Sequence, residues 1–206
     1  MGLDMYLEKG IKIPKKNKEN EFIDFDELKK INDLIANDEN EDIIETYKDY
    51  VFDCGDYLHW KSLFKEVIYW RKANAIHQWF VDNVQGGVDN CRYYEVSKEQ
   101  IEELRDKCIE VMSVIELEDG KVSCGYSFKR KENGELERVD YWEDGKVVKN
   151  PNEVAMILPT QSGFFFGCTD YDQWYYEDIK RTLAELNKLL KETDFEKEYL
   201  VYKSSW

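Results

Sequence analysis

The sequence predicts an α+β protein, in which a long central helix and two or three further helices pack against a mainly antiparallel sheet. Three patterns indicate this class: apolar residues at helical spacing, alternating runs at both ends of the chain, and turn dipeptides between residues 117 and 149. With 206 residues and 42% hydrophobic side chains, the chain is long enough to bury a sizeable core. We therefore expect residues 1–206 to form a single domain, with 117–149 as a β-hairpin insertion within it.

The first quarter of the chain alternates between expected elements and polar connectors. Residues 3–7 alternate apolar and polar side chains, as a short strand does. Residues 25–36 carry apolar side chains at helical spacing and predict a helix. The polar stretches 12–20 and 38–42 read as exposed loops, and residues 43–52 fit either a helix or a strand.

The longest expected helix runs from about Trp60 to Val84, where Gly86-Gly87 provides a stop signal. This segment is apolar on two sides of a helical wheel, which is typical of a helix buried in a core. A second helix is expected from Ser97 to about Ile115, because Ser97 and Gln100 have the spacing of a capping box.

The C-terminal half begins with a predicted β-meander at residues 117–149. Its strand-like runs are separated by hairpin-turn dipeptides at Asp119-Gly120, Asn133-Gly134 and Asp144-Gly145. Residues 154–158 then predict a further strand, and a third helix is expected from Thr169 to about Lys191. Residues 198–203 alternate like the first strand, so we expect the first and last strands to pair.

The charge of −15, from 44 acidic and 29 basic residues, disfavours binding to nucleic acid or to an anionic membrane through charge. The acidic residues are spread along the chain, which is typical of a solubilising surface. The five cysteines are widely spaced without a CxxC pair, as expected for reduced thiols in a cytosol. Because no apolar run approaches the ~18 residues that a membrane span needs, we expect a cytoplasmic protein without a membrane partner.

Familiar catalytic motifs are absent from the sequence, including GxSxG, the P-loop, HExxH and a GxGxxG that follows a strand. Two histidines cannot form a three-histidine metal site, and no mixed ligand set has a recognisable spacing. We therefore expect no metal and no cofactor, name no catalytic residue, and lean toward a protein that is not an enzyme.

One segment, residues 57–80, combines aromatic side chains with four basic residues and a single glutamate. On the expected helix, Asn74 and His77 share a stripe with apolar residues, so they face inward and need hydrogen-bond partners. A cationic, amide-rich patch between rings suits a phosphate or carboxylate on a planar group. The residues predicted to bind such a ligand are Trp70, Arg71, Asn74, His77 and Gln78.

Each candidate has a purely structural alternative. Asn74 and His77 also fit the description of core groups paired with protein atoms; if both are sealed and paired, the ligand hypothesis for this face fails. A second candidate is the turn at residues 160–163, where Gln161 and Ser162 could contribute polar groups to the same site. Its alternative is an ordinary turn that uses the backbone freedom of Gly163.

Four segments resemble a family of bacteriophage and prophage proteins: GLDMYL at the start, YWRKANAIHQWF at 69–80, LPTQSGFFFG at 158–167 and YKSSW at the end. The resemblance spans both ends and the middle of the chain. It implies an accessory protein that works in the cytosol of a bacterial host. It implies no activity and no catalytic residue.

The leading hypothesis is a phage-encoded, non-catalytic binding protein that captures a small anionic, nucleotide-like ligand or blocks a component of host defence. One alternative is an enzyme that acts on a nucleotide or phosphoester with His77 as general acid or base. Another is an acidic protein–protein inhibitor of a host defence component. The expected partner is thus a small anionic ligand or a host protein, and the oligomeric state stays open.

Overall fold

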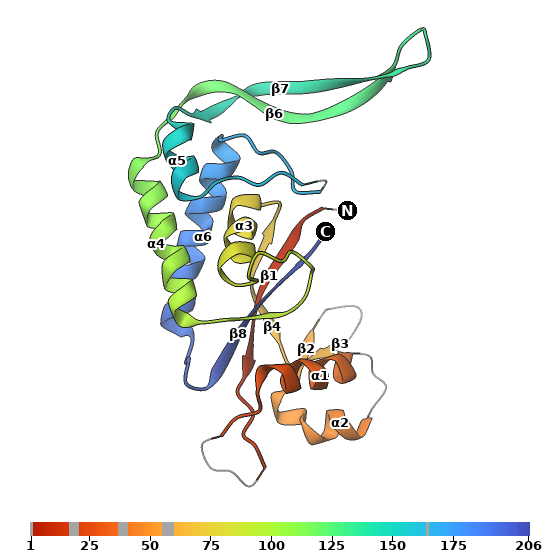
Figure 1. Cartoon of the computed structure of the whole chain (residues 1–206), viewed down its shortest axis with the longest axis vertical. Coiled ribbons are helices and arrows are strands. Elements are labelled where there is room, and N and C mark those ends of the chain that lie inside the picture. Colours follow the sequence, from red (N-terminus) through yellow and green to blue (C-terminus); the bar gives the residue numbers. More distant parts are fainter. Residues whose placement is uncertain (1, 17–20, 37–40, 55–59, 164) are drawn as a thin grey trace.

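The computed structural model describes residues 2–16, 21–36, 41–54, 60–163 and 165–206, and Figure 1 shows its arrangement. Residues 17–20 and 38–40 of the two predicted connectors lie outside the described residues. The helices are α1 (Phe25–Ala36), α2 (Glu41–Thr46), α3 (Asn74–Asn83), α4 (Lys98–Val114), α5 (Pro151–Ile157) and α6 (Gln173–Glu192), with a short 3-10 turn at Lys48–Tyr50. The strands are β1 (Asp4–Ile11), β2 (Phe52–Cys54), β3 (Trp60–Ser62), β4 (Lys65–Arg71), β5 (Tyr94–Val96), β6 (Leu117–Arg130), β7 (Leu136–Val148) and β8 (Glu198–Ser205).

The α+β class is confirmed, and its centre is a four-stranded sheet in the order β4-β1-β8-β5. Every neighbouring pair in this sheet is antiparallel. The predicted pairing of the first and last strands is confirmed, because β1 and β8 run side by side from Asp4–Ser205 to Ile11–Glu198. Both ends of the chain therefore lie in the middle of the sheet, next to each other (Figure 1).

Two apolar clusters cover opposite faces of this sheet. Met5 and Leu7 of β1, with Leu3 just before the strand, point to one face and join the large cluster that α3, α4 and α6 complete. Tyr199 and Val201 of β8 belong to the second cluster, which α1 covers on the other face. Successive side chains of a strand point to opposite faces of the sheet. The apolar residues on each face therefore determine which helices pack there.

The prediction of one helix from residue 60 to 84 is wrong in its first half. Residues 60–62 and 65–71 are strands, and only Asn74–Asn83 are helical. The apolar run Val67 to Trp70 is rich in β-branched and aromatic residues, which favour a strand, and Ile68 and Trp70 are buried at a period of two. The apolar residues of this run also fit a helical spacing, and that spacing led to the wrong prediction of a helix.

The prediction of a strand at residues 154–158 is also wrong, because Pro151–Ile157 form α5. A proline in the first helical turn is a start signal that outweighs the short apolar run. By contrast, α4 begins with the predicted capping box at Ser97, and α6 covers most of the third expected helix.

The region 117–149 is one long hairpin, β6–β7, and the expected meander with three turns is wrong. Only Asn133-Gly134 lies in the turn, while Gly120 and Gly145 pair with each other inside the strands. A Cβ at Gly120 would lie 2.7 Å from Val147 Cγ2, so this glycine serves close packing instead of a turn. The hairpin extends well beyond the body (Figure 1); its status as an insertion within a single domain stays a prediction.

Among the described helices, none combines the length and the apolar character needed to cross a bilayer.

Candidate functional site

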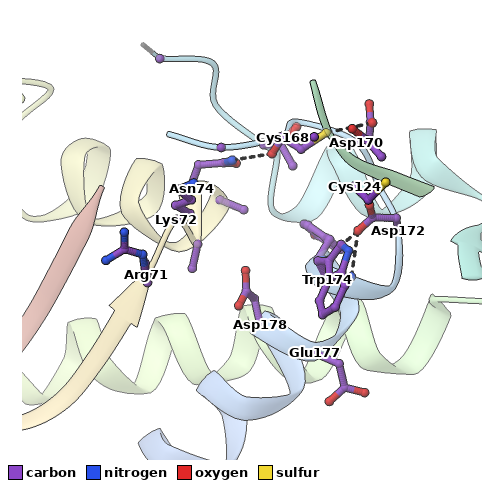
Figure 2. A pocket seen from close by; sticks show the side chains of 18 of the residues that line it. Arg71, Lys72, Asn74, Cys124, Cys168, Asp170, Asp172, Trp174, Glu177 and Asp178 are labelled. Atoms are coloured by element: carbon purple, nitrogen blue, oxygen red, sulfur yellow. Dashed lines mark hydrogen bonds between the residues drawn. The ribbon is translucent and has the colours of Figure 1, made fainter. Parts of the chain in front are cut away.

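A cleft of about 1120 Å³ opens where β4 ends and α3 begins. Its other walls are the loop at residues 160–172, the first turns of α6 and the middle of the hairpin (Figure 2). The volume is slightly above the range of ~300–1,000 Å³ that is typical of small-molecule sites. The cleft is the main candidate for a binding site in the described chain.

Lys72 connects β4 to α3 and has a left-handed backbone, with φ of 60°. Such a conformation is uncommon for a residue other than glycine, and strain of this kind is concentrated at functional sites. Two glycines leave room for its side chain: a Cβ on Gly167 would lie 3.2 Å from Lys72 Cβ, and one on Gly2 would lie 3.3 Å from Lys72 Cε. Within the described residues, Lys72 forms no ion pair.

Arg71, the last residue of β4, provides a second cation at the same wall. Its Nη1 lies 3.1 Å from Asp4 Oδ1, and the Tyr69 hydroxyl donates to the same carboxylate. The Arg71 side chain is still 56% exposed. One carboxylate thus orients the guanidinium without burying it, which leaves donors for a ligand.

The N-terminus of α3 lies at this wall too. No side chain caps the helix at Ala73, and its first turn contains no acidic residue. Among the described residues, the backbone N–H groups of Ala75 and Ile76 have no acceptor, and both residues line the cleft. Uncapped N–H groups and the positive end of the helix dipole favour an anion at this position.

Asn74 is a structural part of the wall and offers no free group to a ligand. It is 4% exposed, and its Nδ2 donates to the carbonyls of Phe166 at 3.2 Å and Cys168 at 2.8 Å. Its Oδ1 accepts from the Gln161 backbone N–H at 3.1 Å. The side chain therefore fixes the loop at residues 160–168 against α3.

The opposite wall is the start of α6, and here the helix N-terminus is already satisfied. Asp172 is buried, and its Oδ1 accepts from the backbone N–H groups of Trp174 at 2.8 Å and Tyr175 at 3.3 Å. Burial raises the pKa of Asp172, and these two hydrogen bonds act against the rise. Two helix N-termini thus border one cleft, but only that of α3 is uncapped.

Asp178 and Trp174 lie one turn apart on α6, and both line the cleft. Trp174 is 55% exposed. Asp178 is half-buried, and no hydrogen bond reaches its carboxylate from the described residues. Burial raises the pKa of Asp178 to about 7, with Asp172 adding to the rise and Arg181 opposing it. Figure 2 shows Asp178 between Lys72 and Arg71 on one side and Trp174 on the other.

The rim carries two exposed thiols, Cys124 of the hairpin and Cys168 of the loop. Burial and the carboxylate of Asp170, which accepts from Cys168 Sγ at 2.9 Å, raise the pKa of Cys168. A raised pKa keeps this thiol protonated and a poor nucleophile at neutral pH.

The hairpin also contributes an aromatic residue to the cleft, Tyr126, and the Arg138 guanidinium lies 4.3 Å from the centre of its ring.

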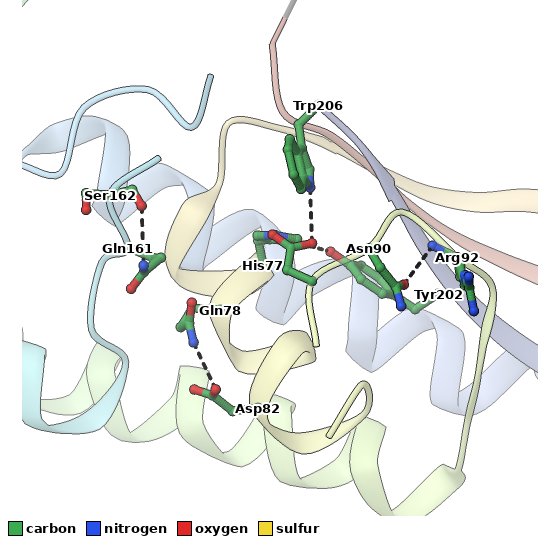
Figure 3. A network of polar contacts seen from close by, with 10 residues as sticks. His77, Gln78, Asp82, Asn90, Arg92, Gln161, Ser162, Tyr202 and Trp206 are labelled. Atoms are coloured by element: carbon green, nitrogen blue, oxygen red, sulfur yellow. Dashed lines mark hydrogen bonds and ion pairs between the residues drawn. The ribbon is translucent and has the colours of Figure 1, made fainter. Parts of the chain in front are cut away.

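His77 belongs to a separate network on the other side of α3, in which the imidazole itself is buried (Figure 3). It is 0% exposed; its Nδ1 lies 2.7 Å from the Tyr202 hydroxyl and its Nε2 lies 3.0 Å from Asp89 Oδ2. Trp206 Nε1 donates to the other oxygen of Asp89 at 3.1 Å. Burial lowers the pKa of His77, although Asp89 acts in the opposite direction. The neutral imidazole connects α3 to the last strand.

The remaining predicted residues lie apart from one another. Trp70 is buried, and its Nε1 donates to Thr182 Oγ1 at 2.8 Å. Gln78 pairs with Asp82 on the surface of α3. The Gln161 side-chain amide donates to the backbone carbonyl of Ser162 at 3.3 Å, and neither residue lines the cleft (Figure 3).

Of the predicted ligand residues, the structure thus brings only Arg71 and Asn74 to one cleft. Sequence reasoning missed Lys72, Trp174 and Asp178. A signal for Asp178 did exist, because it lies on the border of the buried stripe of α6, where a carboxylate is unusual. No sequence signal indicated the left-handed backbone at Lys72.

Within the described residues, no group of three His, Cys, Asp or Glu side chains is arranged to hold a metal. No protein-family model matches the chain, and neither a curated protein nor a solved structure matches it. The case for a function therefore depends on the geometry of the cleft.

Proposed function

We propose that the protein binds a small anionic, nucleotide-like ligand in the cleft and does not transform it. The observation that carries this proposal is the coincidence, at one wall, of the uncapped α3 N-terminus with Arg71 and Lys72. Backbone N–H groups and two cations together suit a phosphate or a carboxylate. The exposed ring of Trp174 offers a surface for a planar group at the opposite wall.

The site differs from the one that the sequence predicted. His77 is excluded as a ligand because both of its ring nitrogens are paired in the core. Asn74 acts by holding the loop that forms one wall. Only Arg71 keeps the role of a direct ligand, and Lys72 joins it.

From the resemblance of its four segments to phage proteins alone, we further propose a setting. The protein would act in the cytoplasm of a bacterial host and remove a nucleotide-like signal on which a defence system depends. Tight binding without turnover is sufficient for that role, since capture lowers the concentration of free ligand.

Isothermal titration against nucleoside monophosphates, nucleoside diphosphates and cyclic dinucleotides tests the proposal. We expect at least one of them to bind. The double variant Arg71→Ala with Lys72→Ala should lower the affinity for it at least a hundredfold. The matched control is Arg105→Ala with Lys107→Ala on α4, which changes the net charge equally at partly exposed side chains outside the cleft. Absence of binding across the panel, or equal losses in both double variants, would contradict the proposal.

One observation favours an enzyme as the second candidate: Asp178 has a pKa of about 7 in a cleft that also contains Lys72. A carboxyl group that titrates near neutral pH can act as general acid or base on a phosphoester. Incubation of the same nucleotides with the protein, followed by chromatography after denaturation, separates the two functions. A binder returns each nucleotide intact, whereas an enzyme gives a product that Asp178→Asn abolishes.

The exposed aromatic residues of the hairpin favour a third candidate, an inhibitor that binds a host protein. Tyr126, Phe128 and Trp142 are each more than half exposed, and exposed apolar patches often mark protein contacts. Co-purification with a host protein that persists in Lys72→Ala and is lost in Phe128→Ser with Trp142→Ser would favour this candidate over ligand capture.

A further inference from the structure

The two walls of the cleft carry opposite charge. This restricts the chemistry of the ligand further than the need for an anionic group alone. Arg71, Lys72 and the start of α3 are positive. Across the space lies the carboxylate of Asp178 on α6. A ligand that carried only negative charge would match one wall and be repelled by the other.

Asp178 is the group at the acidic wall that lacks a partner. Its neighbour Asp172 accepts two backbone hydrogen bonds, whereas Asp178 accepts none from the described residues. A half-buried carboxylate without donors is costly, and donors from a ligand would remove that cost. Trp174 lies one turn before Asp178, so a ring packed on the indole would bring its edge to the carboxylate.

We propose that the ligand carries N–H donor groups at the end opposite its anionic group, and that the ionised carboxylate of Asp178 accepts them. This inference rests on the proposed function and names the chemical class of the ligand. A guanine nucleotide has this arrangement: a phosphate at one end, a flat ring, and an edge with two parallel donors, N1–H and N2–H. A carboxylate accepts two parallel N–H groups from such an edge, as it does from an arginine fork.

The protonation of Asp178 gives the inference a pH signature. Its pKa of about 7 means that roughly a tenth of the groups are ionised at pH 6 and nine-tenths at pH 8. Because only the ionised form accepts both N–H groups, the affinity should rise about tenfold over this interval. A protonated Asp178 that donated to a phosphate would give the opposite slope. The charged or titratable groups around Asp178 are Arg181, Glu177 and Asp172 on or beside α6, Arg71 and Lys72 opposite, and Arg138 and Glu143 on the hairpin.

The experiment compares ribose 5-phosphate, inosine 5′-monophosphate, guanosine 5′-monophosphate and adenosine 5′-monophosphate by calorimetry at pH 6 and pH 8. Ribose 5-phosphate reports the anionic end alone and corrects for ionisation of the phosphate, whose second pKa is about 6. We expect guanosine monophosphate, which presents N1–H and N2–H side by side, to bind at least tenfold more tightly at pH 8 than the other two nucleotides. The inosine compound lacks the 2-amino group, and the adenosine compound has an acceptor at N1. We also expect this preference to fall at pH 6 and to disappear in Asp178→Asn, with ribose 5-phosphate binding unchanged.

Two kinds of failure are distinguishable. If all four compounds bind with equal affinity and Asp178→Asn has no effect, the cleft recognises the anion alone, so the inference fails while the proposed function stands. If none of them binds and the wider nucleotide panel is also negative, both fail. The variant Glu177→Gln removes the carboxylate of the preceding residue, which pairs with Lys180 and points away from Arg71 and Lys72, and it should leave the preference intact.

Discussion

The two polar regions that flank α3 differ in what occupies their hydrogen bonds. On one side, His77 has both ring nitrogens paired with protein atoms and no exposed surface. On the other, Lys72, Asp178 and the N–H groups of Ala75 and Ile76 lack such partners within the described chain and border a cleft. The comparison teaches that buried polar residues on an apolar face indicate architecture, while unpaired groups at an opening indicate binding.

The largest effect should come from the His77 network. His77→Ala leaves the buried Tyr202 hydroxyl without its partner and opens a cavity, so we expect a loss of about 3 kcal/mol in the free energy of unfolding. Urea denaturation measures this loss. The control is the neighbouring Gln78→Ala, which should lower the free energy of unfolding by less than about 0.5 kcal/mol. A His77→Ala protein within 1 kcal/mol of the wild type would mean that the network is dispensable.

Asn74→Ala should affect both regions. The substitution leaves the carbonyls of Phe166 and Cys168 and the N–H of Gln161 without partners, at a cost of about 2 kcal/mol in stability. Because the loop forms one wall of the cleft, affinity for the panel nucleotides should fall as well. Asn83→Ala removes one hydrogen bond at the end of the same helix and is the control for both readouts. Unchanged affinity in a destabilised Asn74→Ala protein would separate the loop from the site.

Lys72→Gly should raise the stability of the protein and lower its affinity for the ligand. Glycine adopts the left-handed backbone without strain, so we expect a gain of about 1 kcal/mol in the free energy of unfolding. Affinity should fall at least tenfold, because the ammonium group is lost. Lys72→Ala keeps the strain while removing the charge, and it should lose affinity without gaining stability. A Lys72→Gly protein that binds normally would show that the strained lysine serves no ligand.

The smallest expected effect concerns Asp178 and the dependence of stability on pH. Its folded pKa of about 7 is above the ordinary value of a carboxyl group, so the folded state holds a proton that the unfolded state has released. Stability should therefore fall as pH rises from about 4 to about 7 and then level off, by about 1 kcal/mol once partial exposure is considered. Asp178→Asn should remove this decline in thermal melts, whereas Glu177→Gln should retain it. A steeper decline in Asp178→Asn would contradict the assignment.

The sequence predicted the elements whose signals are local. The capping box at Ser97 and the alternation of the first and last strands gave the start of α4 and the β1–β8 pair. Apolar spacing failed at residues 60–71, because helical and strand periods share several positions in a short run and β-propensity decided the outcome.

The candidate site could be predicted only in part. The charge of the segment around Arg71 was visible, and the structure confirms that Arg71 lines the cleft. The opposite wall, with Trp174 and Asp178, lies about a hundred residues away along the chain, and only the tertiary fold brings it near. The pairing of His77 with Tyr202 and Asp89 depends on the same long-range packing, so the histidine alone was uninformative.

The most direct test of the central claim is a titration of the ¹⁵N-labelled protein with pyrophosphate, followed through its backbone amide signals. The claim predicts saturable shifts at Lys72, Ala75 and Ile76, which Lys72→Ala weakens, and no comparable shift at His77 or Asp89. Shifts centred on the His77 network, or a response at the α3 N-terminus that never saturates, would contradict it.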